Sequence, residues 1–305
     1  MQTEMTPEHR HLAVETLRLR YWQLVVNEAL KQKQFKVPIH VAIGHEAIAI
    51  AVNAMMESGD QLILTHRNMA YHLARAGALG PIDEEYHLLP TGVAGGRLGS
   101  MNLANPSRGV IYSSSILGNN LSVACGLALG RQVVQRGGVV TVLTGDGGME
   151  EGAFYEGLVL AKSHRLRLLI LIENNNCSMS STIEQRRCPI AVESLCAAVR
   201  MPYHSLTSND VIEYAEALRD LRFVVAQGET PACLEVQLAA LNQHAGPTPG
   251  WPTDPKHIRL ERGLVVEETP NDPVFVLQQR IGHERFASLS EHVLAAETST
   301  TLSSH

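Results

Sequence analysis

The stretch TGDGGMEEGAFYEG, residues 144–157, places an aspartate between glycines directly after the apolar run VVTVL at 139–143. A short apolar run rich in Val and Leu predicts a buried strand, and such strands are typical of a parallel sheet covered on both faces. Open α/β sheets bind ligands at the carboxyl ends of their strands. The sequence therefore predicts an α/β fold, a parallel sheet covered by helices on both faces, with Asp146 at a ligand site.

A second polar side chain is expected beside Asp146. The apolar run at 166–172 predicts another strand, which ends shortly before Asn175, and a helical segment at 150–163 joins the two runs. Because this is a strand-helix-strand unit, Asp146 and Asn175 should emerge at the carboxyl ends of neighbouring strands. A carboxylate and an amide carbonyl are hard oxygen donors that suit Mg²⁺ or Ca²⁺, and magnesium commonly takes its remaining ligands from water and phosphate.

Glycines around the aspartate point to the same ligand. Gly145, Gly147 and Gly148 would let backbone N–H groups approach a phosphate, and the positive end of the following helix would face it. The pattern predicts a metal-bridged diphosphate. The alternative interpretation is a turn that merely flanks a solvated aspartate.

Periodicity predicts the remaining elements. Apolar spacing and turn residues favour helices at 7–35, 44–56, 118–136, 150–163, 209–227 and 272–295, and strands at 61–64, 139–144, 166–172 and 232–238. The Gly-rich stretches 91–115 and 244–255 are expected to be loops. With no internal repeat and no linker, we expect one domain over 1–285 and a frayed tail over 286–305.

Composition excludes several classes of protein. The chain has 305 residues, of which 45% are hydrophobic and 18% charged, with a net charge of -6, and no basic run with interleaved aromatics is present. No nucleic-acid partner is therefore expected. No apolar run is long enough for a membrane span, and the polar start lacks the pattern of a signal sequence, so no membrane association and a cytoplasmic location are expected. Five cysteines without a CxxC pattern indicate reduced thiols.

The whole run GDGGMEEGAFYEGLVLAKSHRLRLLILIENNNCSMSS, 145–181, resembles the thiamine-diphosphate motif, GDG followed about thirty residues later by NN. It is most similar to the version in the alpha subunits of 2-oxo-acid dehydrogenase complexes, such as those acting on pyruvate or acetoin. IHVAIGHEA at 39–47, THR at 65–67 and GSMNLA at 99–104 are similar to that family's HxxxGQEA segment, its diphosphate-contacting region and its GSMH loop. The resemblance covers roughly 10–260 and implies the thiamine-diphosphate-binding fold.

The resemblance implies roles for individual residues. Asp146, Asn175 and the backbone carbonyl of Cys177 would ligate Mg²⁺, with Ca²⁺ as the alternative ion. Around thiamine diphosphate the expected cofactor-binding residues are His66, Arg67, Ser115, Leu117, Gly145, Asp146, Gly147, Gly148 and Asn175. Arg67 would hold the diphosphate, and Ser115 and Leu117 would contact the aminopyrimidine. The alternative interpretations are a surface arginine and a plain helix-entry loop.

The resemblance also implies a catalytic histidine, and it has gaps. His244 matches the second histidine of the family's YRYHGHS-like loop, although Ala240, Leu241 and Asn242 replace the residues that flank it. Met69 and Asn102 stand where the family has histidines. Tyr71 and His72 are candidate substitutes, with a core or surface role as the alternative for each.

A chain of this length lacks the pyrimidine-binding domain, which the family places on a beta subunit together with the activating acid. We therefore expect an α2β2 assembly with a beta-type partner. The expected activity is cleavage of a C–C bond next to a carbonyl, in a 2-oxo acid or ketose, with transfer of the activated acyl or aldehyde unit. The alternatives are a carboligase or transketolase-like enzyme that uses a carbonyl acceptor, and an inactive scaffold or regulatory partner. Because Met69 and Asn102 replace family histidines, the sequence does not decide whether a lipoyl domain is the acceptor.

Overall fold

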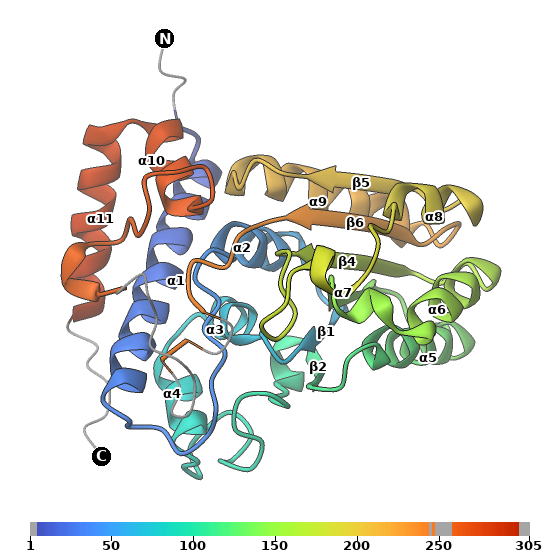
Figure 1. The fold of residues 1–305 in the computed structure, drawn as a ribbon, viewed down its shortest axis with the longest axis horizontal. Coiled ribbons are helices and arrows are strands. Elements are labelled where there is room, and N and C mark those ends of the chain that lie inside the picture. Colours follow the sequence, from blue (N-terminus) through green and yellow to red (C-terminus); the bar gives the residue numbers. More distant parts are fainter. Residues whose placement is uncertain (1–4, 244–245, 248–257, 299–305) are drawn as a thin grey trace.

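The computed structural model describes residues 5–243, 246–247 and 258–298. Its centre is a six-stranded sheet in the order β2-β1-β3-β4-β6-β5, in which every neighbouring pair is parallel (Figure 1). The strands are β1 (Gln61–Thr65), β2 (Val110–Ser114), β3 (Val140–Gly145), β4 (Leu168–Asn174), β5 (Tyr203–Leu206) and β6 (Ala232–Gln237). The chain leaves β1 for β2 on one side and returns to β3 on the other, so the strand order reverses around β1.

Helices cover both faces of this sheet. The described helices are α1 (Pro7–Lys31), α2 (Glu46–Met55), α3 (Met69–Ala76), α4 (Gly80–Tyr86), α5 (Asn119–Val133), α6 (Gly152–Ser163), α7 (Ile183–Arg186), α8 (Val192–Ala198), α9 (Val211–Ala226), α10 (Pro273–Ile281) and α11 (His283–Thr298). Leu169 and Leu171 of β4 join a core with α1, α2 and α9, whereas Ile170 and Ile172 join one with α5, α6 and α8. Because successive strand residues point to opposite faces, this alternation confirms the expected doubly covered parallel sheet.

Most of the long elements begin and end near their expected positions. The helix predicted at 209–227 is α9, and its N-cap is Asp210, whose carboxylate accepts from the backbone N–H of Ile212 at 2.9 Å. That bond satisfies one of the amide donors that a helix N-terminus leaves without an intrahelical partner. None of the described helices has both the length and the apolarity to cross a membrane.

Two expectations about irregular segments are wrong. The stretch 91–115 was expected to be a loop throughout, but its end forms β2 after a turn at Gly109, where φ is +81°. A five-residue strand in a polar context carries too little periodicity to be seen in the sequence. The helix expected at 272–295 is two helices, α10 and α11, which are separated at Gly282 with φ +87°.

The frayed tail expected from 286 is also wrong as far as Thr298. Helix α11 buries Phe286, Leu289 and Val293 against the core that contains α1, and the two helices lie side by side in Figure 1. Glu297 near its end accepts hydrogen bonds from Trp22 at 2.7 Å and from Arg18 at 2.9 Å. These contacts come from the other end of the chain, so the local sequence does not reveal them.

Candidate functional site

A pocket lies where β1, β2, β3 and β4 end. It is lined by all of the expected cofactor-binding residues, His66, Arg67, Ser115, Leu117, Gly145, Asp146, Gly147, Gly148 and Asn175, and by Cys177. Residues that lie more than a hundred positions apart in the sequence therefore meet in one site. The pocket is at the carboxyl edge of a parallel sheet and next to the reversal of strand order, which is where open α/β sheets bind ligands.

In the turn after β3, Gly147 and Gly148 lie closer to neighbouring side chains than any larger residue could. A Cβ atom on Gly147 would lie 2.3 Å from Oγ of Ser178, and one on Gly148 would lie 2.3 Å from Oγ1 of Thr144. Both glycines are buried, and the 3₁₀ turn Gly148–Glu150 starts at this point. Gly147 and Gly148 thus pack so closely against Ser178 and Thr144 that neither position has room for a side chain.

Asp146 and Asn175 offer oxygen donors. Asp146 is 2% exposed, and its Oδ2 lies 2.7 Å from Nη2 of Arg186, which also pairs with Glu150. Oδ1 of Asn175 accepts from the backbone N–H of Cys177 at 3.1 Å. Among the described residues no group of three His, Cys, Asp or Glu side chains could hold a metal. The donor set thus fits Mg²⁺ only as an ion that shares its shell with phosphate or water, and Arg186 competes with such an ion for the charge of Asp146.

Arg67 is a buried cation in the lining of the pocket. It is 6% exposed, so the surface-arginine interpretation is wrong, and its Nη1 donates to the carbonyl oxygen of Val41 at 2.7 Å. Burial lowers the pKa of Arg67, and electrostatic interactions with Glu173, Cys177 and Asp146 oppose that shift. Guanidinium pKa values start so high that the group stays charged, so Arg67 supplies positive charge for an anion in the pocket.

Two polar groups of the site, His45 and Glu173, were not singled out from the sequence. His45, 1% exposed, lines the pocket and places Nδ1 2.9 Å from Oε1 of Glu173, another lining residue. Tyr71 donates its hydroxyl to the same oxygen at 2.7 Å. Burial, followed by the charge of Glu173, raises the pKa of Tyr71 well above its usual value, so the phenol remains a donor. The sequence held one sign of His45: the segment GHEA at 44–47 has a histidine where the resembling family has the glutamine of GQEA.

The candidate substitutes for the missing histidines separate in the structure. Tyr71 reaches the pocket through Glu173, as described above. His72 is instead a core residue: it is fully buried with Nε2 3.1 Å from the carbonyl oxygen of Leu103, and burial lowers its pKa to about 4. Met69 is buried at the start of α3, Asn102 is exposed, and neither lines the pocket. His244, like most of the loop predicted at 244–255, lies outside the described residues.

The segment that leads toward His244 is tied to the turn before α2. Asn242 accepts from the backbone N–H of Ile43 at 3.0 Å and donates to the carbonyl oxygen of Val41 at 3.0 Å. Gly44 has φ +104°, and a Cβ there would lie 2.1 Å from the carbonyl oxygen of Ala239. The asparagine that replaces a family histidine thus holds two backbone segments together.

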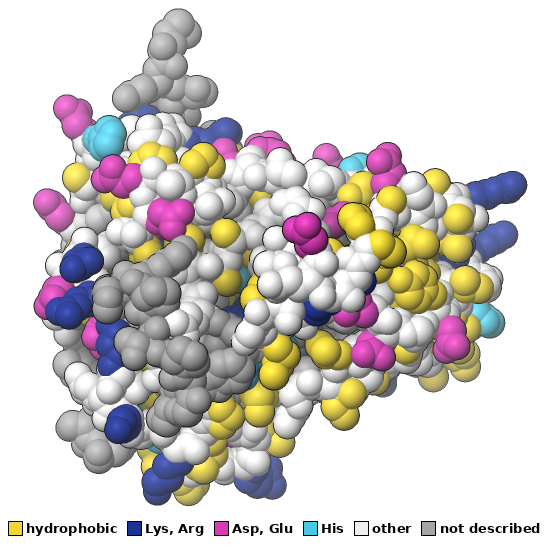
Figure 2. Space-filling view, viewed as in Figure 1, with side chains coloured by type: hydrophobic (Ala, Val, Ile, Leu, Met, Phe, Trp, Pro, Cys, Tyr) yellow, Lys and Arg dark blue, Asp and Glu magenta, His cyan; other side chains and the backbone are white. Residues whose placement is uncertain are grey.

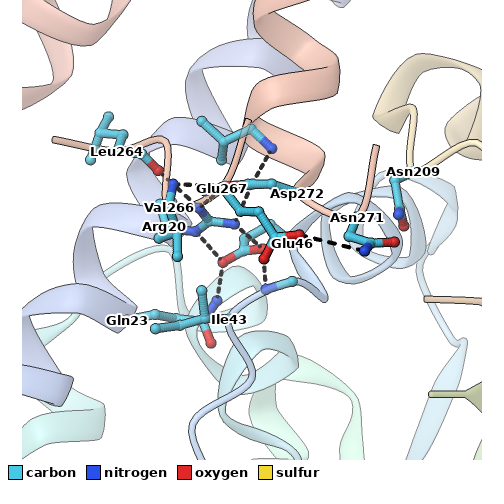
Figure 3. A network of polar contacts seen from close by, with 12 residues as sticks. Arg20, Gln23, Ile43, Glu46, Asn209, Leu264, Val266, Glu267, Asn271 and Asp272 are labelled. Carbon is cyan, nitrogen blue, oxygen red and sulfur yellow. Dashed lines mark hydrogen bonds and ion pairs between the residues drawn. The ribbon is translucent and has the colours of Figure 1, made fainter. Parts of the chain in front are cut away.

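A buried ionic network fixes the same turn from the other side (Figure 3). Arg20 of α1 lies between Glu46, the residue after His45, and Asp272, the N-cap of α10. All three side chains are fully buried. Glu46 also accepts from the backbone N–H of Gly44 at 2.9 Å and from Gln23 at 2.7 Å. The residue that follows His45 is therefore held in place by α1, and Arg20 of α1 is itself held by the N-cap of α10.

Comparison with known proteins assigns the family. The family model described as "Dehydrogenase E1 component" matches residues 18–256, which is most of the chain. The chain belongs to the dehydrogenase E1 component family. The resemblance to its alpha subunits is thereby confirmed, since the similar proteins include such subunits.

The relatives of this E1 chain include the alpha subunit of the acetoin:2,6-dichlorophenolindophenol oxidoreductase of Bacillus subtilis, 28% identical over 72% of this chain and 66% of the relative. The Cupriavidus necator protein of that name is 26% identical over 68% of this chain and 62% of its own length. The alpha subunit of the E1 component of human mitochondrial pyruvate dehydrogenase is 23% identical over 90% of this chain and 68% of the relative. The matched segment thus spans slightly less than two thirds of the acetoin relatives.

Solved structures support the fold. A transketolase from Pichia stipitis superposes with a TM-score of 0.61 at 18% identity, covering 94% of this E1 chain and 47% of that protein. Transketolase from Leishmania mexicana gives 0.60 at 16% identity, with 94% and 48% covered. The likeness confirms the expected thiamine-diphosphate-binding α/β fold, and at this identity it carries no information on substrates.

Proposed function

We propose that this E1 chain is the alpha subunit of a heteromeric thiamine-diphosphate-dependent enzyme that cleaves a C–C bond next to a carbonyl and transfers the activated acyl or aldehyde unit. The observation that carries the proposal is the single pocket in which the glycine turn, Asp146, Asn175 and the buried Arg67 come together. These groups supply hard oxygen donors, the backbone N–H groups of the glycine turn and a buried cation, the set that a metal-bound diphosphate needs.

Each part of the pocket has a defined task in this proposal. Asp146, the amide oxygen of Asn175 and the backbone carbonyl of Cys177 hold Mg²⁺, or Ca²⁺ in its place. Backbone N–H groups of the turn at 145–148 and the guanidinium of Arg67 hold the diphosphate, with His66 beside it. When bound, thiamine diphosphate supplies the electron sink for C–C cleavage. The chain's own residues orient it and limit water access.

The pocket mouth supports the proposal of a partner. Ile116 and Leu117 at the mouth are 67% and 45% exposed, and Met179, two residues after Cys177, is 58% exposed. Figure 2 shows hydrophobic side chains gathered on the right of this face, and Tyr155, Val159 and Leu160 of α6 are also exposed. Apolar side chains around a ligand site mark a surface that another chain covers. We propose that a beta-type subunit covers this apolar surface and supplies the pyrimidine-binding domain and the activating acid in an α2β2 assembly. In that assembly Ser115 and Leu117 contact the aminopyrimidine.

Two acceptor chemistries fit this alpha subunit. The first is oxidative transfer from a 2-oxo acid, with a lipoyl domain as acceptor and His244 as the catalytic histidine. The second is transfer to a carbonyl compound, as in a carboligase. The absence of imidazoles at Met69 and Asn102 favours the second, whereas the relatives' names favour the first. The inactive-scaffold reading is opposed by Asp146 and Arg67, two buried charges that a merely structural chain has no physical reason to keep in an open pocket.

The test is calorimetric titration of thiamine diphosphate with Mg²⁺ into the chain co-expressed with its beta-type partner. Saturable binding is expected for the wild type and for Asp220→Ala, which removes an exposed carboxylate from α9. Binding should weaken at least 100-fold in Asp146→Ala, because a metal loses its only charged protein ligand. Absence of binding by the intact wild-type heteromer would overturn the proposed function.

A further inference from the structure

His45 is the buried imidazole of the pocket with one ring nitrogen available. Its Nδ1 faces Glu173 at 2.9 Å, and its Nε2 is buried without a hydrogen-bond partner among the described residues. A buried polar atom that lacks a partner is destabilising, so its retention in a ligand pocket points to a group that the ligand supplies.

The contacts of His45 determine which chemistry Nε2 offers. A carboxylate only accepts hydrogen bonds, so Nδ1 of His45 must carry the proton that it shares with Glu173. Tyr71 donates to the same carboxylate oxygen at 2.7 Å and helps to hold it in place. In the neutral imidazole the second nitrogen is then a lone-pair acceptor. A ligand hydroxyl satisfies such an acceptor, whereas a ligand carboxylate, which has no proton to donate, does not.

We propose that His45 is a substrate-contacting residue whose Nε2 accepts a hydrogen bond from a hydroxyl next to the substrate's carbonyl, so that the pocket selects a 2-hydroxy ketone over a 2-oxo acid. Glu173 and Tyr71 are positioning residues that fix the tautomer. This inference rests on the proposed function and decides between its substrate classes.

The rigidity of the turn makes the selection effective. Glu46, the next residue, is held by Arg20 at 2.6 and 2.9 Å (Figure 3). Leu241 donates its backbone N–H to the carbonyl oxygen of Ile43 at 2.9 Å. His45 therefore cannot turn away when a substrate without a hydroxyl enters. A fixed acceptor that is left unpaired discriminates between ligands more strongly than a mobile one.

The experiment compares acetoin with pyruvate on the co-expressed heteromer. For the wild type, kcat/KM should be higher with acetoin. In His45→Ala the value for acetoin should fall at least 10-fold relative to that for pyruvate, mainly through KM. His164→Asn, which removes an exposed imidazole at the end of α6, should change neither.

A second variant tests the tautomer. Glu173→Ala removes the acceptor that fixes Nδ1 of His45 as a donor, so that the imidazole can adopt either tautomer; the preference for acetoin should weaken. Tyr71→Phe, which leaves the carboxylate in place, should keep the preference for acetoin. Binding provides a readout that is independent of turnover: saturation-transfer NMR on the cofactor-free heteromer should detect acetoin with the wild type and lose it with His45→Ala.

The outcomes separate the two proposals. Equal losses for acetoin and pyruvate in His45→Ala, or an unchanged preference in Glu173→Ala, would overturn the role of His45 and leave the proposed function standing. A wild-type heteromer that binds thiamine diphosphate but favours pyruvate would also overturn it. A heteromer that binds no thiamine diphosphate would overturn both.

Discussion

Replacing Arg20 by Met removes the cation at the centre of the buried network in Figure 3. The change keeps the length and apolar stem of the side chain but leaves Glu46 and Asp272 facing each other without a counter-charge. Both carboxylates are fully buried, so water cannot replace the guanidinium. We expect Arg20→Met to be among the most destabilising single changes outside the apolar core.

The magnitude follows from the contacts that are lost. Arg20 donates to Glu46 at 2.6 and 2.9 Å, to Asp272 at 2.9 and 3.2 Å, and to the carbonyl oxygen of Leu264 at 2.8 Å. Removing one partner of a buried ion network destabilises the fold by about 3–5 kcal/mol. For a chain of 305 residues this corresponds to a fall in Tm of about 5–8 °C.

The direction of one pKa adds a second signature. Burial disfavours the charged carboxylate of Asp272, but Arg20 outweighs it and lowers the pKa of Asp272 below its usual value of 3.8. A lowered carboxyl pKa contributes stability that is present above pH 3.8 and is lost as the pH falls through the folded-state pKa. In Arg20→Met this part of the acid sensitivity should disappear.

Thermal and urea unfolding of the wild type and the variant, followed by circular dichroism, measure the effect. Arg219→Met is the matched control, because Arg219 pairs with Glu8 at an exposed site and its loss should change the stability by less than about 1 kcal/mol. The triple variant Arg20→Met, Glu46→Gln, Asp272→Asn removes all three charges and should recover a large part of the loss. An effect of Arg20→Met no larger than that of the control would refute the argument.

Three further outcomes are expected. His72→Gln should flatten the acid dependence of stability, because a histidine pKa lowered from 6.5 to about 4 weakens the wild type by up to about 3 kcal/mol as the pH falls from 6.5 to 4; unfolding at pH 4 and 7 measures this difference. Gly148→Ala should destabilise the fold by about 1–3 kcal/mol and abolish diphosphate binding. Gly152→Ala, where a Cβ meets nothing within 4 Å, should have neither effect. Thermal unfolding measures the stability and calorimetric titration measures the binding of both variants. Arg186→Met should tighten Mg²⁺ binding several-fold, because the ion no longer displaces a guanidinium from Asp146; unchanged Mg²⁺ affinity would contradict the counter-ion role.

Much of the site was predictable because its residues follow strands in sequence. Asp146 and Asn175 each come directly after a long apolar run, and the carboxyl ends of parallel strands meet at one edge whatever the details of packing. The expected diphosphate-contacting residue Arg67 follows β1 in the same way. The sequence did not decide whether Arg67 is a surface residue or a site residue. That depends on its burial, and in the structure it is buried and donates to the carbonyl oxygen of Val41.

The apolar runs at 139–143 and 166–172 and the glycine turn were sufficient by themselves to predict a parallel sheet and the edge at which a ligand binds, because each acts within one element or between neighbouring strands. Only the tertiary structure decided the rest. It brought Glu173, Tyr71 and His45 from three separate segments into contact, placed Arg186 on Asp146, and ordered α11 against α1. These features depend on the side-chain environment that distant segments create, and that environment exists only once the chain has folded.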